Sequence, residues 1–524
     1  MTCSRYMVLA LALGIAACGD SASTGNSPAA PPSEPVPTAE PAPVPTPAPA
    51  PPSSASLTHD FGDYVLGPGQ EVGSQCVSWT LDNAESLWVS AVTVSNSGAY
   101  HHSNWFVVPE TTFPGEDGYF RCRDREFSEL GAAVEGTVLF AQSTQSQLET
   151  QSFVPGAVIK VPPHHKVVAG IHMLNPSARE ITTQFRMTLE LAHPRDVEVL
   201  LKPFRISYYA LDIPANSEAR YTAECDLEAL AETVTGRPLD IKLYWVLPHY
   251  HYSGNYFRAE LIGGERDGEL LHTIDRFNAE ANGKMFDPPV DLTGATGIRM
   301  TCGFRNPTDE EIGWGIGDQE MCVMLGLASG DVLMDAWVDE DTHGDDGVDD
   351  GIFRRSGNCE GLAVPSNAAQ VPPTDAEMQR ALYVPESKPS DVDLPPVLLC
   401  IDASLGASAE APVTFQSIRD TVLTPSCAFS ACHGAESPVA GLDLETDPHE
   451  ALLTRSVTSA QTEMPLVMPG DPSNSWLYRL LSQCEPTDDA GNVVASMPRN
   501  APNLLDDAVI AKVRAWIEAG APND

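Results

Sequence analysis

The alternation of apolar and polar residues predicts a mainly β protein over residues 57–338. Residues 185–191 (Phe-Arg-Met-Thr-Leu-Glu-Leu) alternate strictly, and the runs at 87–94 and 241–247 are rich in β-branched and aromatic residues. Turn signals such as Asn-Pro separate these runs. So many short strands over about 280 residues favour two tandem antiparallel, jelly-roll-like β-sandwiches, at 57–200 and 201–338, over a single one.

The apolar period becomes helical near the C-terminus. Asp506 can cap a helix on which Val509, Val513, Trp516 and Ile517 fall on one stripe, and a second helix is predicted from Pro472 onward. We therefore expect a small all-α domain at 411–524.

Residues 339–410, between these parts, combine an Asp/Gly cluster with Pro- and Ser-rich sequence. Asp339, Asp341 and Asp345 partly mimic a calcium loop, but flanking helices are not predicted and an Asp stands where such a loop carries its bidentate Glu. We interpret this segment as a solvated acidic linker, with calcium binding as the alternative.

The N-terminus has the pattern of an export signal. Arg5 precedes the apolar run 8–15, which is too short to span a bilayer and ends in small residues before Cys18. Ile-Ala-Ala-Cys resembles a bacterial lipobox, which implies a signal peptide at 1–17 and a lipid on Cys18; an ordinary signal peptide with an incidental cysteine is the alternative. Gly19 favours the outer membrane. We therefore expect a lipid-anchored protein of the bacterial envelope.

The composition agrees with export and argues against one class of binding partner. Residues 18–56 form a Pro-rich spacer, with twelve prolines between positions 28 and 52. The chain has 30 Lys and Arg against 72 Asp and Glu, a net charge of −42, which argues against a nucleic-acid partner. Twelve cysteines are too many for an inert cytosolic enzyme.

Five histidines and one methionine are candidate metal ligands. His249 and His251 end a predicted strand, and their i,i+2 spacing puts both imidazoles on one face. His101 and His102 are adjacent, so a local irregularity is needed before they converge, with His172 as the third ligand. Each histidine alone is more typical of a surface or core residue, and we assign His164-His165 to a surface loop.

Together these segments resemble the copper type II, ascorbate-dependent monooxygenases, the family of peptidylglycine α-hydroxylating monooxygenase and dopamine β-monooxygenase. The family order His-His, His, His-x-His and Glu-Met-Cys is reproduced across residues 57–338, and the Gly-rich run 312–317 precedes Met321. The resemblance implies two copper ions, O2 as co-substrate, ascorbate as a reductant and hydroxylation of a substrate C–H bond.

Carried over by residue, His101, His102 and His172 look like the ligands of an electron-storing copper. His249, His251 and Met321 look like those of the oxygen-binding copper. A thioether is a soft donor that suits Cu(I), and imidazole suits both oxidation states of copper, whereas zinc more usually recruits a Cys or a carboxylate.

The resemblance also implies disulfides. Cys302–Cys322 and Cys76–Cys122 match family bridges, and Cys225 is paired with Cys359, with Cys400 as a competitor; Cys484 has no assigned partner.

Two departures from the family concern the substrate. The peptide-hydroxylating member binds a substrate carboxylate through an Arg two residues before His-x-His and a Tyr four residues after the Met. Leu247 and Leu325 occupy those positions here. A carboxylate would lose its charged, bidentate partner, so we expect a neutral substrate, a small molecule or a peptide, rather than a glycine-extended peptide.

The C-terminal domain contains Cys427-x4-Cys432-His433. This run resembles an expanded c-haem attachment motif; a local disulfide is the alternative. The surrounding sequence resembles small cytochrome c-like domains, which implies thioethers at both cysteines and His433 as the proximal ligand. Met497 is the first choice for the sixth ligand, ahead of Met468 and Met464. The haem would receive electrons from an envelope donor.

The sequence therefore predicts a copper monooxygenase joined to a c-type cytochrome. The competing interpretation is a non-catalytic copper and haem electron carrier, which Leu247 and Leu325 favour.

Overall fold

The computed structural model describes most of the chain from residue 54 onward. The described residues are 54–524 apart from 143–146, 176–179, 252, 275–282, 307, 316–318, 331, 366–369, 387–399, 429–431, 436–441, 459–462, 488–493, 495 and 499–504. Cys18, the signal peptide and the Pro-rich spacer lie outside them. Within the described ranges no helix is long and apolar enough to cross a bilayer.

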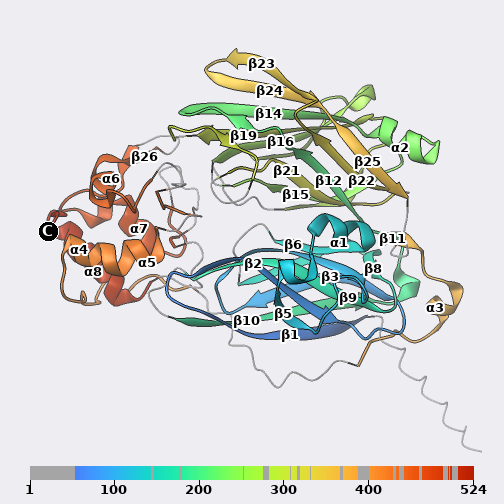
Figure 1. Cartoon of the computed structure of the whole chain (residues 1–524), viewed down its shortest axis with the longest axis horizontal. Coiled ribbons are helices and arrows are strands. Elements are labelled where there is room, and N and C mark those ends of the chain that lie inside the picture. Colours follow the sequence, from blue (N-terminus) through green and yellow to red (C-terminus); the bar gives the residue numbers. More distant parts are fainter. Residues whose placement is uncertain are drawn as a thin grey trace, which may run out of the picture. The chain divides into compact units, whose positions relative to one another are not determined.

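The protein is mainly β, and its strands form two pairs of sheets (Figure 1). In the first pair, one sheet has the order β1-β10-β3-β8-β11 with β7 also on β3, and the other has the order β5-β2-β9-β4-β6. Their bounds are β1 Ser54–Leu66, β2 Glu71–Thr80, β3 Leu87–Asn96, β4 Tyr100–Pro109, β5 Gly118–Arg121, β6 Thr137–Gln142, β7 Leu148–Ser152, β8 Ala157–Val161, β9 His165–Leu174, β10 Ile181–Ala192 and β11 Val199–Leu200. Helix α1, Glu129–Glu135, precedes β6.

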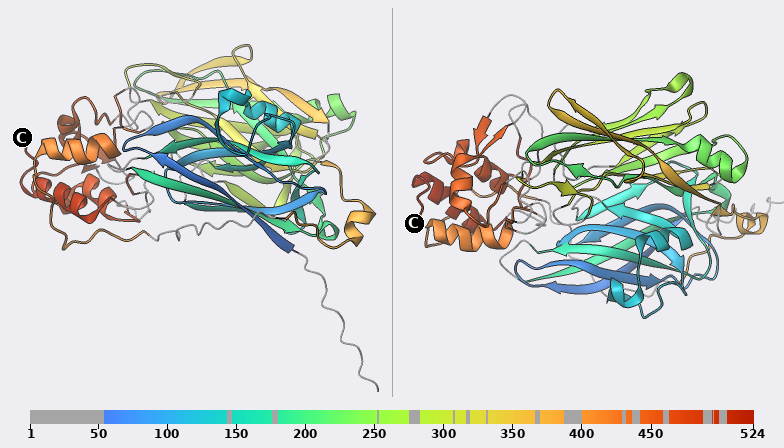
Figure 2. Two further views of the ribbon diagram at one scale, coloured as in Figure 1. Left: turned by 60° about the horizontal axis from the view of Figure 1, so that its bottom comes forward. Right: turned by 45° about the horizontal axis from the view of Figure 1, so that its top comes forward.

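The second pair has sheets of order β18-β15-β21-β12-β22-β25 and β17-β16-β19-β14-β24-β23, with β13 and β20 forming a small ladder beside them. Their bounds are β12 Lys202–Tyr208, β13 Asp212–Ile213, β14 Ser217–Asp226, β15 Lys242–His249, β16 Gly254–Ile262, β17 Leu270–Ile274, β18 Lys284–Asp291, β19 Gly297–Asn306, β20 Ile312–Gly313, β21 Val323–Ala328, β22 Val332–Val338, β23 His343–Asp349, β24 Ile352–Asn358 and β25 Glu360–Pro365. Helix α2, Leu227–Thr235, follows β14. Figure 2 shows both pairs from two further sides.

Alternation in the sequence explains the cores. In β10 every second side chain is buried from Thr183 to Leu191, because successive side chains of a strand face opposite ways. Both sheets of the first pair contribute to one apolar cluster, including Val77, Trp105 and Leu189, and the second pair has its own around Tyr221 and Phe257. Trp245 and Leu247 of β15 belong to the first cluster, so the two pairs are in apolar contact.

The sheets are mixed rather than purely antiparallel as predicted. The pairs β8–β11, β12–β22 and β14–β24 are parallel. A parallel pair needs a long crossover connection, and more than a hundred residues separate β12 from β22. Sequence-local patterns report strands but carry no information on such distant pairing.

The prediction of an acidic linker over residues 339–410 is wrong for the first half of that range. Residues 343–365 form β23, β24 and β25, and β23 is an edge strand. An edge strand has one unpaired side, so acidic residues are tolerated there and hinder edge-to-edge association. Arg355 forms ion pairs with Asp345 (Nη1 to Oδ1, 2.6 Å) and with Asp212 (Nε to Oδ2, 3.1 Å). These pairs offset part of the negative charge of the strand. Farther on, α3, Asp375–Gln379, begins with a capping box at Thr374.

The C-terminal part is helical, as expected, with one small β ladder that the prediction of an all-α domain lacked. Its helices are α4 Phe415–Ile418, α5 Thr424–Ser426, α6 Pro448–Thr454, α7 Trp476–Ser482 and α8 Asp507–Glu518, and its strands are β26 Ser456–Thr458 and β27 Glu463–Pro465 (orange to red in Figure 1). Val513, Trp516 and Ile517 of α8 are fully buried, which confirms the predicted stripe.

Four disulfides join eight of the ten described cysteines. Three are predicted pairs: Cys76–Cys122 and Cys302–Cys322, which match family bridges, and Cys225–Cys359, which was the first choice for Cys225. The fourth, Cys400–Cys484, ties the start of the helical part to the end of α7 and removes Cys400 as a competitor for Cys225.

Candidate metal centre

A β-bulge brings His101 and His102 to the same place. Along the β4–β9 ladder Tyr100 is opposite Met173 and His102 is opposite His172, so His101 is the extra residue. Such an insertion re-aims a side chain and supplies the irregularity that adjacent histidines need. The ring centroids lie 5.1 Å apart for His101–His102 and 4.8 Å for His101–His172. Nitrogen atoms of all three rings lie within 4.8 Å of one another.

Glu71 of β2 orients His172. The Nε2–H of His172 donates to Glu71 Oε1 at 2.9 Å, which leaves Nδ1 as the acceptor toward His102 Nε2 at 3.1 Å. Burial lowers the pKa of His102 well below its usual range, and the neighbouring histidines add to this shift. Neutral imidazole is the form that binds metals. Glu71 was not predicted, because the sequence gives no sign that it opposes β9.

The second histidine pair lies at the end of β15. Tyr250 between them is buried in the core of the second sheet pair, so His249 and His251 face the other way, with centroids 5.4 Å apart. His251 Nδ1–H donates to the carbonyl of Gln319 at 2.6 Å, which leaves Nε2 available. Burial lowers the pKa of His249 to about 3. The ring of His249 lies 6.4 Å from that of His102.

Glu320 ties this pair to Met321. Its side chain is fully buried, and it accepts hydrogen bonds from His251 N (2.7 Å), Ser253 N (2.7 Å), Ser253 Oγ (2.8 Å) and Met321 N (3.3 Å). Burial raises the pKa of Glu320, and His251 and these hydrogen bonds offset part of the shift. Met321 is thereby placed through its backbone, next to the Cys302–Cys322 bridge. The sequence marked Glu320 only as part of Glu-Met-Cys.

The remaining predicted ligands lie in the helical part. Cys427 and Cys432 are thiols outside the four disulfides, and His433 N donates to Cys427 O at 3.0 Å. Burial raises the pKa of Cys427 to about 12. Met497 and Met464 pack against the core of this part, whereas Met468 is 45% exposed. Of the predicted loop pair, His164 is exposed but His165 is buried at the start of β9.

Comparison with known proteins adds little. No protein-family model and no curated protein matches the chain. Among solved structures, VP54 of PBCV-1, fitted into a reconstruction of the virophage Sputnik, is 5% identical with a TM-score of 0.21 over 53% of this chain and 95% of that one. VP2 of infectious bursal disease virus is 12% identical with a TM-score of 0.14, over 53% of this chain and 72% of that one. The Macrobrachium rosenbergii nodavirus structure is 8% identical with a TM-score of 0.13, over 58% of this chain and 96% of that one. These scores are too low to bear on function.

Proposed function

We propose that the two sheet pairs form a copper-dependent monooxygenase that hydroxylates a C–H bond. The observation that carries this proposal is the convergence of His101, His102 and His172 through the bulge. A substrate C–H bond, O2, two electrons and two protons would give an alcohol and water. Bound at these donors, copper would supply one-electron transfer and the activation of O2.

The donor set fits copper. A hydrogen bond holds His102 Nε2 and His172 Nδ1 3.1 Å apart. A metal ion bound by both nitrogens would take the place of the proton that they share. Glu71 and the Gln319 carbonyl fix the outer nitrogens of His172 and His251, which is the usual arrangement behind metal-binding histidines. Met321 would add the thioether that favours copper over zinc.

The chain's own residues would orient the site in two ways. Glu320 holds the loop of His251 and Met321 by four hydrogen bonds, and the Cys302–Cys322 bridge fixes the residue after Met321. Tyr250, buried behind the two histidines, fixes their direction. These contacts keep the donors in place before any metal arrives.

Replacing His172 with alanine is expected to lower the copper content by about one ion per chain, because the three-histidine set loses the ligand that Glu71 orients. Elemental analysis and copper EPR of the purified protein measure this. The matched control is His164→Asn, at an exposed histidine with φ of 57°, which Asn tolerates. Equal copper in both variants, or zinc in the wild type, would contradict the proposal. Copper without substrate-stimulated O2 uptake would favour the electron carrier.

We propose further that the helical part binds a c-type haem and passes electrons to the copper sites. Cys427 and Cys432 would hold the haem by thioethers, with His433 and Met497 as axial ligands. Met468 is a poorer candidate for the sixth ligand because its side chain is exposed. When bound, such a haem supplies one-electron transfer at a potential that a Met ligand raises. Lipid attachment at Cys18 would hold the whole protein at the envelope.

Changing both Cys427 and Cys432 to serine is expected to abolish covalent haem and leave the copper content unchanged, because the two sites use different segments. Haem staining after denaturing electrophoresis and elemental analysis provide the readouts, on protein matured in a periplasm competent for cytochrome c. Met468→Leu, at an exposed position of the same part, is the control that should keep its haem. Haem that survives in the double-serine variant would refute thioether attachment.

A further inference from the structure

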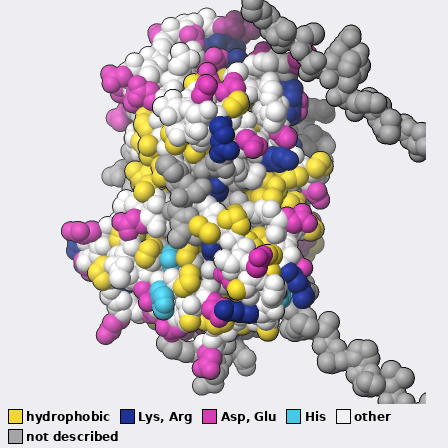
Figure 3. All heavy atoms as spheres, turned by 90° about the vertical axis from the view of Figure 1, so that its right-hand side faces the viewer, with side chains coloured by type: hydrophobic (Ala, Val, Ile, Leu, Met, Phe, Trp, Pro, Cys, Tyr) yellow, Lys and Arg dark blue, Asp and Glu magenta, His cyan; other side chains and the backbone are white. Residues whose placement is uncertain are grey.

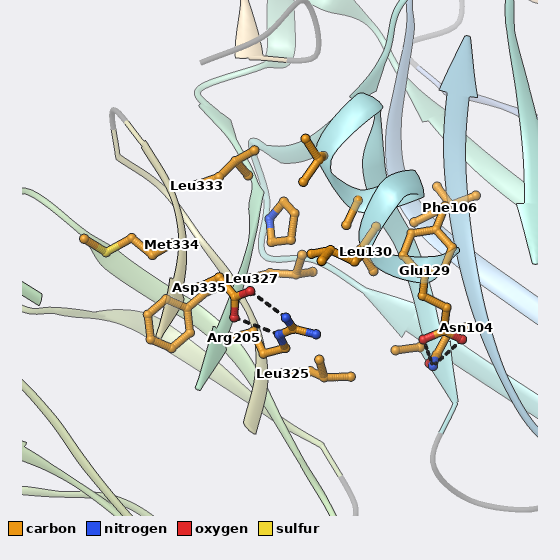
Figure 4. Close-up of a pocket in the computed structure, with 18 of the residues that line it drawn as sticks. Asn104, Phe106, Glu129, Leu130, Arg205, Leu325, Leu327, Leu333, Met334 and Asp335 are labelled. Atoms are coloured by element: carbon orange, nitrogen blue, oxygen red, sulfur yellow. Dashed lines mark hydrogen bonds and ion pairs between the residues drawn. The ribbon is translucent and has the colours of Figure 1, made fainter. Parts of the chain in front are cut away.

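An apolar cavity lies between the two sheet pairs. Its volume is about 130 Å³, and its lining comes from β4, α1 and β6 on one side and from β12, β21, β22 and β25 on the other. Figure 4 shows Phe106 and Leu130 facing Leu325 and Leu327 across it. A cavity of roughly 150 Å³ holds a benzene ring, so this one fits a single ring or a short alkyl chain.

The charged groups of the wall already have partners. Arg205 donates to both carboxylate oxygens of Asp335, at 2.8 and 2.5 Å, and Asn104 Nδ2 donates to Glu129 at 3.2 Å (Figure 4). The guanidinium is therefore occupied by a bidentate ion pair. An anionic ligand would have to break that pair or enter without a counter-charge.

Strand geometry connects the cavity to the histidines. His102, Asn104 and Phe106 alternate along β4, so they share one face, and Asn104 and Phe106 line the cavity. On the other wall, Leu325 lies two residues from Val323, which pairs with His249. Two residues span about 7 Å of strand, so the inner end of the cavity borders the candidate metal centre.

The outer end of the cavity is apolar and open. Leu130 and Val134 of α1 and Leu362 of β25 are 54%, 44% and 46% exposed and line it. In the space-filling view of Figure 3, hydrophobic side chains gather across the middle of one face, with acidic side chains above and below them and Lys and Arg side chains among both. An apolar molecule could enter here.

We infer that this cavity is the substrate site, and that its substrate is a small, neutral, mainly apolar molecule whose buried part is about the size of one aromatic ring. This inference rests on the proposed function. Leu325 and Leu327 are part of the wall and supply apolar surface at the end nearer the histidines.

Binding of three matched probes to the copper-free full chain tests the inference, by calorimetry and ligand-detected NMR. Benzyl alcohol is expected to bind, and benzoate at least about tenfold more weakly, since its charge has no free partner. Benzoate of equal affinity would overturn the inference. Benzylammonium as the tightest ligand would also overturn it, and would point to Glu129 as a cation partner.

Leu130→Asp is expected to weaken benzyl alcohol binding by about tenfold, because it puts a hydrated charge at the apolar mouth. Leu130 is exposed, so folding should survive. Leu148→Asp is the matched control, at a leucine of β7 that is 52% exposed and outside the cavity wall. Equal effects of the two changes would overturn the cavity assignment.

Copper content, measured separately, distinguishes the two proposals. Copper uptake without selective binding of benzyl alcohol would overturn the cavity assignment alone. Selective binding to a chain that takes up no copper would overturn the proposed function and keep the cavity as a site for neutral molecules. In the copper-loaded protein, benzyl alcohol at a concentration near its Kd for the wild type should perturb the copper EPR of the wild type and of Leu148→Asp, and that of Leu130→Asp much less.

Discussion

Replacing Glu320 with glutamine is expected to loosen the loop that carries His251 and Met321 and to deplete copper at the site proposed for His249, His251 and Met321. The carboxylate accepts from two donors on each oxygen, Ser253 on one and His251 and Met321 on the other. A glutamine of the same size must point its NH2 group at one of these pairs. At least one buried N–H then loses its acceptor, at a cost of about 2–4 kcal/mol including the lost charge-assisted bonds.

Thermal and denaturant unfolding measure the stability loss, and elemental analysis measures the copper. Ser253→Ala should have an intermediate effect of about 1 kcal/mol, because it removes one of the four hydrogen bonds. Glu232→Gln, at an exposed position of α2, is the control. If Glu320→Gln unfolds like the wild type and keeps its copper, the carboxylate has no positioning role.

Most strands and three of the four disulfides were predictable from the sequence because each leaves a local or motif-level mark, whereas Cys400–Cys484 was not predicted. The alternation at 185–191 predicts the burial pattern of β10, and two disulfides, Cys76–Cys122 and Cys302–Cys322, match pairs implied by a family pattern. The acidic strand β23 leaves no such mark. Most of its side chains are exposed, and its sequence is as acidic and glycine-rich as that of a solvated loop. Its pairing with β24 is what makes it a strand.

The histidines that converge in the candidate site could be named from the sequence, but the residues that support them could not. His101 and His102 could be named, whereas the bulge that makes them converge depends on the register with β9, which is set by distant contacts. Glu71 is 101 residues from His172 in sequence, and the cavity is built from both sheet pairs. Features that depend on tertiary register are invisible to a period-2 or motif analysis.

The direction of His249 and His251 should depend on a glycine behind them. Gly254 follows the turn after His251, whose carbonyl accepts from Gly254 N at 3.2 Å, and a Cβ built on it would lie 2.0 Å from Cδ2 of Tyr250. Tyr250 is 1% exposed and held in the core of the second sheet pair, so its ring has little room to retreat.

Gly254→Ala is therefore expected to shift the turn, to cost about 3 kcal/mol of folding stability and to weaken copper binding by His249 and His251. Unfolding curves and a copper titration followed by EPR provide the measurements. The control is Gly67→Ala, where the nearest atom to the added Cβ, Gln70 Oε1, is at 3.6 Å and no change is expected. If the Gly254 variant has the stability and the second copper of the wild type, Tyr250 does not fix the histidines. If the free energy of copper binding falls by more than the free energy of unfolding, the packing of Tyr250 sets the geometry of His249 and His251.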